Sequence, residues 1–384
     1  MKILIIKTFP VEIKIENITY NHQEIGLATA LRKNGHICDV MCVSEDGMYH
    51  EHQITMDGQN IKLYCVCSLK ILKNGILKNV DTIFNQYDIL QPCEYNQIFT
   101  WHIARKYPNK TVIYHGPYYS SFNKRYNLMA KVFDLFFVNT YRKLNTCFIT
   151  KSNLAANYLN QKRLTNTYPI GVGLGMSFLT NNNHPQHLAE IDKIISIEGI
   201  KLLYIGTIEE RRNSLFLLDI LSELHLNNKK AYLILVGKSK SEKYNNIFWD
   251  KVKRQNLSNY IIHINSIQQK DIAQVYSCAD IFLLPTRYDI FGMVLLEAMF
   301  FKTIVITTVN GGSNMMIENG INGYIIKDFD SKEWSNTIIS SIENDNAQKI
   351  KENAHATIVK SFTWECLAKK FINIYLQKIK ESLS

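Results

Sequence analysis

Two carboxylates and a glycine stand together in one short segment of the chain. Asp289 precedes Phe291-Gly292, and Glu297 follows eight residues after Asp289. The segment comes after the apolar run Ile281–Leu284 and leads into a helical pattern that begins at Met293. Glycine lets the backbone approach a ligand closely, and the amides of a helix N-terminus favour an anion such as phosphate. Because helical side chains lean toward the N-terminus, both carboxylates can face one ligand and accept hydrogen bonds from sugar hydroxyls.

A cation and a histidine also follow apolar runs. Arg212 lies in the loop 206–213 after the run Lys201–Ile205, and His115 follows Thr111–Tyr114. A cation and a helix N-terminus can together stabilise an anion that gains negative charge during a reaction, without a metal. The chain's Asp-x-Asp, Asp328-Phe-Asp330, is far in sequence from this segment, and we interpret it as a helix-capping loop.

Short apolar runs alternate with longer amphipathic ones throughout the chain. The runs that we predict as strands are Ile3–Ile6, Asp39–Val43, Ile98–Trp101, Thr111–Tyr114, Cys147–Thr150, Lys201–Ile205, Ala231–Val236, Tyr260–Ile264, Ile281–Leu284, Thr303–Thr307 and Tyr324–Ile326. They are rich in Ile, Leu and Val without polar alternation, as in strands buried on both faces. Alternation with helices predicts parallel sheets, which bind ligands beyond the carboxyl ends of their strands.

The length of 384 residues favours two domains of ordinary size. A glycine-rich and then polar segment between Gly171 and Gly199 interrupts the alternation and is typical of a linker. We predict a first domain over residues 1–175, a linker over 176–199, a second domain over 200–362 and a C-terminal helix over 363–384. The expected architecture is α/β, with two Rossmann-like, doubly wound domains facing each other across a cleft.

The net charge of +10 has a definite location. Between His102 and Arg163 the chain has eleven Lys or Arg and one acid, Asp134, so this stretch alone accounts for that charge. It is also rich in aromatic residues. A basic, aromatic surface indicates an anionic partner, either lipid headgroups or a phosphorylated acceptor. A solvated basic face beside an ordinary aromatic core explains the pattern equally well.

The remaining composition excludes several classes of protein. A hydrophobic content of 46% and a charged content of 20% are those of a globular protein. No apolar run approaches the roughly 18 residues needed to span a bilayer, and Lys2–Ile6 favours a buried first strand over a signal peptide. The eight cysteines contain no Cys-x-x-Cys pair, so we expect reduced thiols in the cytosol.

These motifs resemble those of retaining glycosyltransferases of the GT-B fold, family 4. The Asp289-x7-Glu297 element with Phe291-Gly292 is similar to the family's Glu-x7-Glu element, with Asp289 in place of the first Glu. The loop 206–213 is similar to a family loop that carries an Arg and a Lys, where this chain has Thr207 and Arg212. The resemblance covers nearly the whole chain, and it is specific over residues 200–325 and loose before residue 100.

Three other segments extend the resemblance. Gly311-Gly312 and the following residues to Gly323 are similar to a family glycine motif, with Met315 at the position of an acid. Tyr168–Gly173 resembles the segment that closes the first domain. The family usually has a glycine pair before its first helix, and Ile18-Thr19 occupy about that position.

The resemblance implies a role for individual residues. Arg212 would pair with the donor diphosphate, Glu297 with the ribose hydroxyls and Asp289 with the sugar hydroxyls. His115 would contact the transferred sugar beside the anomeric carbon, so the implied catalytic residues are Asp289, His115 and Arg212. The implied donor-binding residues are Gly206, Arg212, Asn213, Asp289, Phe291, Gly292, Met293, Val294 and Glu297. The residues that we assign to an acceptor or a membrane are Tyr118, Tyr119, Lys124 and Arg125.

The implied activity is retaining transfer of a hexose-type sugar in bacterial cell-surface polysaccharide synthesis. The donor would be a nucleoside diphosphate sugar such as UDP-glucose, UDP-GlcNAc or GDP-mannose, and the acceptor a glycan or a lipid-linked molecule. We expect no metal cofactor, no nucleic acid partner, and a cytoplasmic protein at the inner face of the membrane, in contact with anionic lipid. We also expect the C-terminal helix to pack back on the first domain. Two alternatives stay open: a nucleotide-sugar 2-epimerase of the same fold, and a catalytically silent homologue that binds a sugar nucleotide.

Overall fold

The computed structural model describes residues 1–15, 22–71, 74–176, 179 and 189–383. Contacts group the chain into two compact units. Unit 1 consists of Met1–Gly175 together with Phe362–Ser384, and unit 2 consists of Met176–Ser361. Ile18, Thr19 and residues 177–178 and 180–188 of the predicted linker lie outside the described residues. None of the described helices is long and apolar enough to cross a membrane.

Unit 2 contains a parallel sheet of six strands in the order β13-β12-β11-β14-β15-β16. The strands are β11 Ile200–Ile205, β12 Ala231–Val236, β13 Ile261–Ile264, β14 Ile281–Leu284, β15 Ile304–Thr307 and β16 Tyr324–Ile325. Counted along the chain, this is the order 3-2-1-4-5-6 of a Rossmann sheet. The strand order reverses between β11 and β14, and ligands of such sheets bind beyond the carboxyl ends of the strands at that point.

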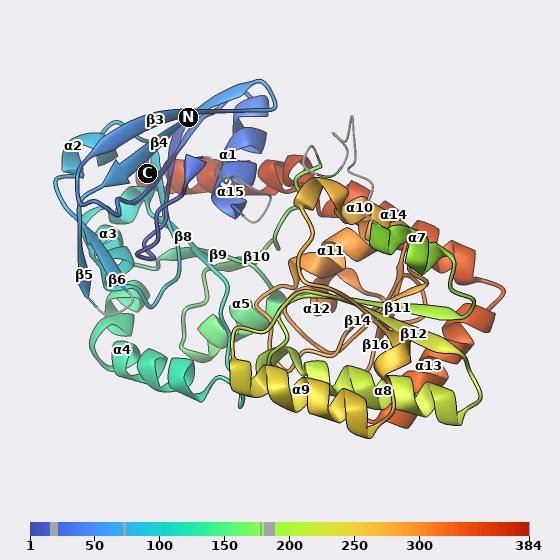
Figure 1. Ribbon diagram of the computed structural model, residues 1–384. Coiled ribbons are helices and arrows are strands. Elements are labelled where there is room, and N and C mark those ends of the chain that lie inside the picture. The colour runs from blue at the N-terminus through green and yellow to red at the C-terminus, as the bar shows by residue number, and fades with distance from the viewer. Residues whose placement is uncertain (16–21, 72–73, 177–178, 180–188, 384) are drawn as a thin grey trace. The chain divides into compact units, whose positions relative to one another are not determined.

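Helices cover both faces of the unit 2 sheet (Figure 1). One group packs around α8 and the other packs on β15. The first group is α8 Ser214–Leu226, α9 Glu242–Arg254 and α13 Ser331–Glu343, and the second is α11 Met293–Phe300 and α14 Ala347–Ser361. The shorter helices are α7 Ala189–Ile195, α10 Ile272–Ser277 and α12 Ser313–Met316. Asp330 caps α13 by accepting a 3.0 Å hydrogen bond from the Lys332 amide, as predicted for the Asp-x-Asp loop.

Unit 1 contains a sheet in the order β3-β4-β2-β1-β7, and β8, β9 and β10 form a parallel sheet beside it. Two parallel bridges, Leu90–Thr111 and Cys93–Tyr114, connect β7 to β8. The strands are β1 Lys2–Ile6, β2 Ile37–Val43, β3 His50–Met56, β4 Gln59–Val66, β7 Ile89–Pro92, β8 Val112–His115, β9 Cys147–Thr150 and β10 Thr167–Pro169, with a separate hairpin of β5 Ser68–Ile71 and β6 Asn74–Leu77. The helices are α1 Gln23–Lys33, α2 Asp81–Phe84, α3 Ile98–Lys106, α4 Lys124–Lys143, α5 Asn153–Gln161 and α15 Trp364–Leu383.

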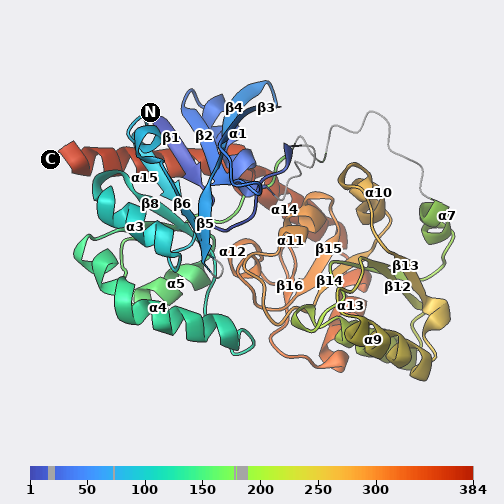
Figure 2. The same cartoon turned by 60° about the vertical axis from the view of Figure 1, so that its left-hand side comes forward.

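The C-terminal helix α15 packs against α1 in unit 1, which confirms the predicted packing on the first domain (Figures 1 and 2). Its first residue, Trp364, is buried against two glycines. A Cβ on Gly26 would lie 2.3 Å from the indole, and one on Gly173 would lie 2.5 Å from it. Further along α15, the Tyr375 hydroxyl donates a hydrogen bond to the side-chain oxygen of Gln91. The chain therefore returns to complete the core of unit 1.

One predicted strand is wrong. Residues 98–101 form the first turn of helix α3, not a strand. The side chains that α3 buries, Phe99, Thr100, Ile103 and Ala104, recur at helical spacing. A short run such as Ile98–Trp101 fits a strand and a buried helix equally well, because periodicity cannot separate them over four residues. The other predicted strands lie within two residues of observed ones.

Candidate functional site

Two loops of unit 2 meet where its strand order reverses. One follows β11 and the other follows β14, which are neighbouring strands. The Arg287 amide donates a 3.0 Å hydrogen bond to the carbonyl of Arg211, and the Arg211 guanidinium donates a 3.0 Å bond to the carbonyl of Tyr288. Arg211 also pairs with Glu209 at 2.6 Å, so this cation links the two loops and its partners hold it in place.

This linkage brings the predicted residues Arg212 and Asp289 into contact. Arg212 Nη1 donates to Asp289 Oδ2, and the two side chains are only 18% and 12% exposed. Burial, followed by the nearby charge of Arg211, lowers the pKa of Arg212, although guanidinium remains protonated in proteins. The Nε of Arg212 is buried without a hydrogen-bond partner among the described residues. The charge of Arg212 is therefore neutralised by Asp289, while its Nε–H remains available to donate a hydrogen bond to a ligand.

Helix α11 begins directly after this ion pair. Its N-cap, Gly292, has φ +79°, a left-handed conformation that glycine adopts without steric cost. The Phe291 amide lies 3.4 Å from Asp289 Oδ1, so the carboxylate stands beside the start of the helix. Glu297, in the second turn, is completely buried and accepts a 2.9 Å hydrogen bond from the Tyr276 hydroxyl. The two predicted carboxylates thus have different partners.

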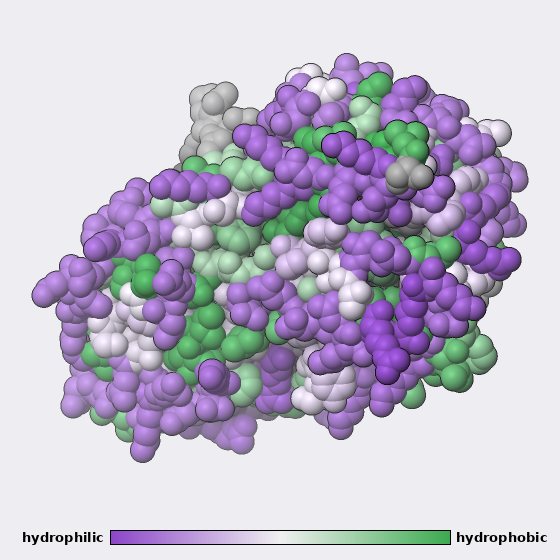
Figure 3. Space-filling model, turned by 180° about the vertical axis from the view of Figure 1, so that it is seen from behind, coloured by the Kyte–Doolittle hydropathy of each residue, from purple (hydrophilic) through white to green (hydrophobic). Residues whose placement is uncertain are grey.

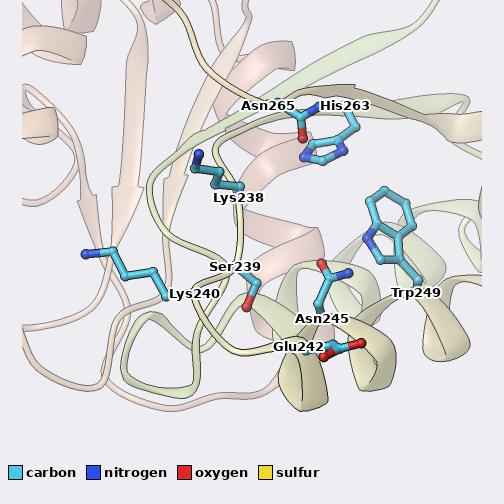
Figure 4. Close-up of a pocket in the computed structure, with 8 residues that line it drawn as sticks. All are labelled: Lys238, Ser239, Lys240, Glu242, Asn245, Trp249, His263 and Asn265. Carbon is cyan, nitrogen blue, oxygen red and sulfur yellow. The ribbon is translucent and has the colours of Figure 1, made fainter.

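A pocket of about 530 Å³ opens beyond the ends of β12 and β13 (Figure 4). Its walls come from the loop after β12, the first turns of α9 and the end of β13; they are Lys238, Ser239, Lys240, Glu242, Asn245, Trp249, His263 and Asn265. The loop starts at Gly237, where φ is +132° and an added Cβ would lie 2.1 Å from the carbonyl oxygen of Gly206. This close approach joins the pocket's loop to the loop that carries Arg212.

In unit 1, three charged residues follow three consecutive strands of the sheet. Glu94 follows β7, His115 ends β8 and Lys151 follows β9. His115 Nδ1 lies 2.8 Å from Glu94 Oε2, the Gly116 amide donates to the same oxygen at 3.1 Å, and Lys151 lies 3.6 Å from the other oxygen. Burial alone would raise the pKa of Glu94, but attraction to Lys151 and the bonds from His115 and Gly116 outweigh it and lower that pKa.

This arrangement fixes the direction of the His115 ring. An ionised carboxylate only accepts hydrogen bonds, so Nδ1 carries the proton that faces Glu94. The Tyr95 amide also lies 3.5 Å from Nδ1, but the shorter contact with Glu94 decides the tautomer. In the neutral ring, Nε2 then has the lone pair, and it is buried without a partner among the described residues. His115 can therefore accept a hydrogen bond from a ligand.

Aromatic rings connect His115 to a pocket in unit 1 that is smaller than the pocket of Figure 4. The rings of Tyr95 and Tyr158 lie 5.0 Å and 6.3 Å from that of His115. Tyr158 also lines a pocket of about 230 Å³ whose other walls are Tyr119, Asn127, Lys131, Gln161 and Lys162. Of the residues assigned to an acceptor or a membrane, Tyr119 lies in this wall, Tyr118 is buried, and Lys124 and Arg125 are exposed on the first turn of α4.

The sequence analysis missed Glu94 and Lys151. Glu94 adopts φ +62°, which is costly for a residue with a side chain and concentrates at functional positions. No motif marks either residue, and only the position after a strand could have suggested them. Among the described residues, no group of three or more His, Cys, Asp or Glu is placed to hold a metal ion.

Residues 190–357 match the family described as glycosyl transferases group 1. These residues belong to that family. The matched group 1 domain contains Arg212, Asp289, helix α11 and the pocket of Figure 4.

Individual relatives align with part of the chain. A probable sucrose-phosphate synthase of Thermosipho melanesiensis is 31% identical over 148 residues, which cover 37% of this chain and 33% of the relative. The O-antigen chain mannosyltransferase B of Escherichia coli is 29% identical over 175 residues, or 45% of each chain. The chain thus matches less than half the length of these curated relatives.

The structural comparison extends over the whole chain. The crystal structure of HepE from Anabaena in complex with UDP has a TM-score of 0.70 and 17% identity, and it covers 98% of this chain and 100% of HepE. At this identity the likeness establishes the fold. The group 1 domain is therefore the second half of a GT-B fold with two doubly wound α/β domains, as predicted.

Proposed function

We propose that this chain is a retaining glycosyltransferase that moves a hexose-type sugar from a nucleoside diphosphate sugar to an acceptor. The observation that carries the proposal is the contact of Arg212 with Asp289 beside the first turn of α11, within a group 1 domain. This contact lies where a Rossmann sheet binds its ligand.

The donor's diphosphate binds at Arg212 and the N-terminus of α11. A helix N-terminus offers unpaired amides and the positive end of the helix dipole. Arg212 is nearly buried, so its charge acts in a medium less polar than water and stabilises the negative charge that develops on the leaving group. Asp289 holds Arg212 until the donor binds, and then accepts hydrogen bonds from the sugar hydroxyls.

The nucleoside part of the donor extends from this point along the ends of the neighbouring strands. The pocket of Figure 4 has the polar groups and rings that a base requires, including Trp249 and His263, whose rings lie 5.2 Å apart. The Gly206–Gly237 approach connects it with the Arg212 loop. The ribose hydroxyls bind Glu297, whose carboxylate is oriented by Tyr276.

The acceptor attacks from the face on which the diphosphate departs, and a leaving phosphate oxygen takes the acceptor's proton. In this mechanism no enzyme nucleophile forms a bond, and configuration at the anomeric carbon is retained. Nε2 of His115 accepts a hydrogen bond from a hydroxyl of the transferred sugar. Glu94 is a positioning residue, because it fixes the tautomer that makes this possible.

The acceptor is a glycan or a lipid-linked molecule of a cell-surface polysaccharide, and the protein works in the cytoplasm at the inner membrane face. The name of the O-antigen mannosyltransferase relative supports a polysaccharide acceptor, and the basic stretch of unit 1 supports an anionic surface. Of the residues assigned to an acceptor or a membrane, the exposed Tyr119, Lys124 and Arg125 make this contact, whereas Tyr118 is buried.

Release of free nucleoside diphosphate tests the proposal. Each of UDP-glucose, UDP-GlcNAc and GDP-mannose is incubated with the full chain, with and without a membrane extract that supplies acceptors. Release that requires the extract supports a transferase. Release or isomerisation without an acceptor indicates an epimerase or a hydrolase. Tight donor binding with no release under either condition indicates a silent homologue and contradicts the proposal.

A further inference from the structure

Helix α4, Lys124–Lys143, is apolar on two faces. Its inward face buries Ala130, Phe133, Val138 and Tyr141 in unit 1. A helix that packs on a domain normally has a polar outer face, because one apolar stripe is enough to attach it to the core. The outward face of α4 departs from this rule.

Five large apolar side chains of α4 point to solvent. They are Leu128, Met129, Val132, Leu135 and Phe136, with exposed fractions of 63%, 48%, 51%, 79% and 67%. At 100° per residue, they fall within one arc of about 120° on the helix surface. Apolar atoms gather at the lower right of the space-filling view, where α4 lies (Figure 3). A contiguous exposed apolar patch of this kind marks an interaction site.

Cations surround the patch. Lys124 and Arg125 are exposed at one end of the helix, Arg142 and Lys143 at the other, and Lys131 is exposed beside its centre. The single acid of α4, Asp134, forms an ion pair with Lys162, the residue directly after helix α5. The outer surface of α4 therefore combines an uncompensated positive rim with an apolar centre.

We propose that this face of α4 docks the protein on an anionic lipid bilayer, with the helix lying flat in the interface. Twenty residues of helix extend over about 30 Å, and a helix with apolar and basic residues together inserts its apolar side at the boundary of headgroups and acyl chains. Basic residues at its rim bind anionic headgroups. A second copy of this chain is a poor partner for this face, because pairing two such faces would place the five cations of one copy against the five of the other, and like charges repel.

Membrane docking rests on the proposed function in placing the protein at the inner membrane face, and it deepens that proposal by naming the outward face of α4 as the contact surface. It uses no property of the donor site. It defines the surface at which the protein meets its acceptor. It is therefore tested by binding, separately from donor binding and turnover.

Vesicle co-sedimentation of the full chain tests the proposal. Wild-type protein should sediment with phosphatidylcholine vesicles that contain phosphatidylglycerol and remain in solution with phosphatidylcholine alone. Leu135→Gln/Phe136→Gln removes the two most exposed apolar side chains and should weaken binding about tenfold or more. The matched control is Leu226→Gln/Ile195→Gln in unit 2, where the wild-type side chains are 75% and 62% exposed. It should bind as wild type does.

A second pair of variants tests the charged rim. Lys124→Ala/Arg125→Ala should weaken binding about twenty-five-fold, because each cation near an anionic surface strengthens binding by a factor of about five. Lys253→Ala/Arg254→Ala removes two adjacent exposed cations at the end of α9 and should have little effect. Raising salt from about 0.1 M to about 1 M shortens the Debye length from about 10 Å to about 3 Å and should weaken wild-type binding.

Three results would overturn the proposal. They are no sedimentation of wild type with anionic vesicles, equal loss of binding in both members of a variant pair, and a Leu135→Gln/Phe136→Gln variant that only converts a dimer to a monomer on gel filtration. Circular dichroism, together with the thermal shift given by whichever nucleotide, UDP or GDP, stabilises the wild type, establishes that each variant is folded. Because the proposed donor site lies in unit 2, the absence of a wild-type shift with both nucleotides would contradict the proposed function without bearing on α4.

Discussion

Replacing Glu94 by Gln should destabilise the protein at neutral pH and much less in acid. The substitution preserves shape but removes the charge that holds His115 Nδ1 at 2.8 Å and attracts Lys151 at 3.6 Å. A hydrogen bond to a charged group contributes about 1.5–3 kcal/mol and a neutral one about 0.5–1.5 kcal/mol. The weakly exposed pair with Lys151 adds at most about 1 kcal/mol. We expect a loss of about 2 kcal/mol at pH 7.

The pH dependence follows from the lowered pKa of Glu94. Because the carboxyl binds its proton more weakly in the folded protein than in the unfolded chain, its stabilising effect is fully present above the unfolded pKa, about 4.5. The effect is lost as the pH falls through the folded pKa. The difference between wild type and Glu94→Gln should therefore be constant from pH 7 to pH 5 and shrink below that range.

Urea unfolding at a series of pH values measures this difference. Glu51→Gln is the control, because Glu51 forms an ion pair with Lys62 that is 42% and 53% exposed and should contribute less than about 1 kcal/mol. An equal destabilisation of Glu94→Gln at all pH values, or none at pH 7, would refute the assigned charge state. In the transferase assay the same variant should lower kcat about tenfold, because the amide can face Nδ1 with either its oxygen or its nitrogen.

Two other predictions concern stability. Trp364→Ala should lower the free energy of unfolding of unit 1 by about 3–5 kcal/mol, because the indole fills the space between Gly26 and Gly173. Urea unfolding followed by circular dichroism measures this loss. A loss below about 1 kcal/mol would contradict the packing. Gly237→Ala should lower the free energy of unfolding by more than about 2 kcal/mol, because its Cβ would meet the Gly206 carbonyl. Gly320→Ala should lower it by only about 1 kcal/mol, because Gly320 has φ +77° but open space around it. Equal midpoints for these two variants in a thermal melt would show that the Gly206–Gly237 approach is unimportant.

The sequence was sufficient to predict the strands of unit 2 and the element around Asp289. Buried parallel strands are continuous apolar runs, and the glycine at 292 ends the loop where α11 starts. Two departures have physical reasons. Ile98–Trp101 is too short for its periodicity to be recognised, and the β3–β4 hairpin was missed although Asp57-Gly58 is a typical hairpin turn.

The candidate site was less predictable than the fold. The contact of Arg212 with Asp289 joins residues 77 positions apart, and it depends on β11 and β14 being neighbours. Which strands are neighbours depends on the strand order of the sheet, and the positions of strands along the sequence do not give that order. Glu94 has no motif of its own, and its function follows only from the packing of β7 beside β8. The role of each site residue therefore remains a prediction from sequence and geometry together.

The most direct test of the donor site is the thermal shift that nucleotide sugars give the full chain. A donor at 100 times its Kd should stabilise the protein by about 2.7 kcal/mol. At least one of UDP-glucose, UDP-GlcNAc and GDP-mannose should raise the melting temperature. Arg212→Ala should weaken that donor's binding about ten- to a hundredfold, while Arg254→Ala should bind as wild type does. A wild-type shift that Arg212→Ala leaves intact, or no shift with any of the three donors, would contradict the account.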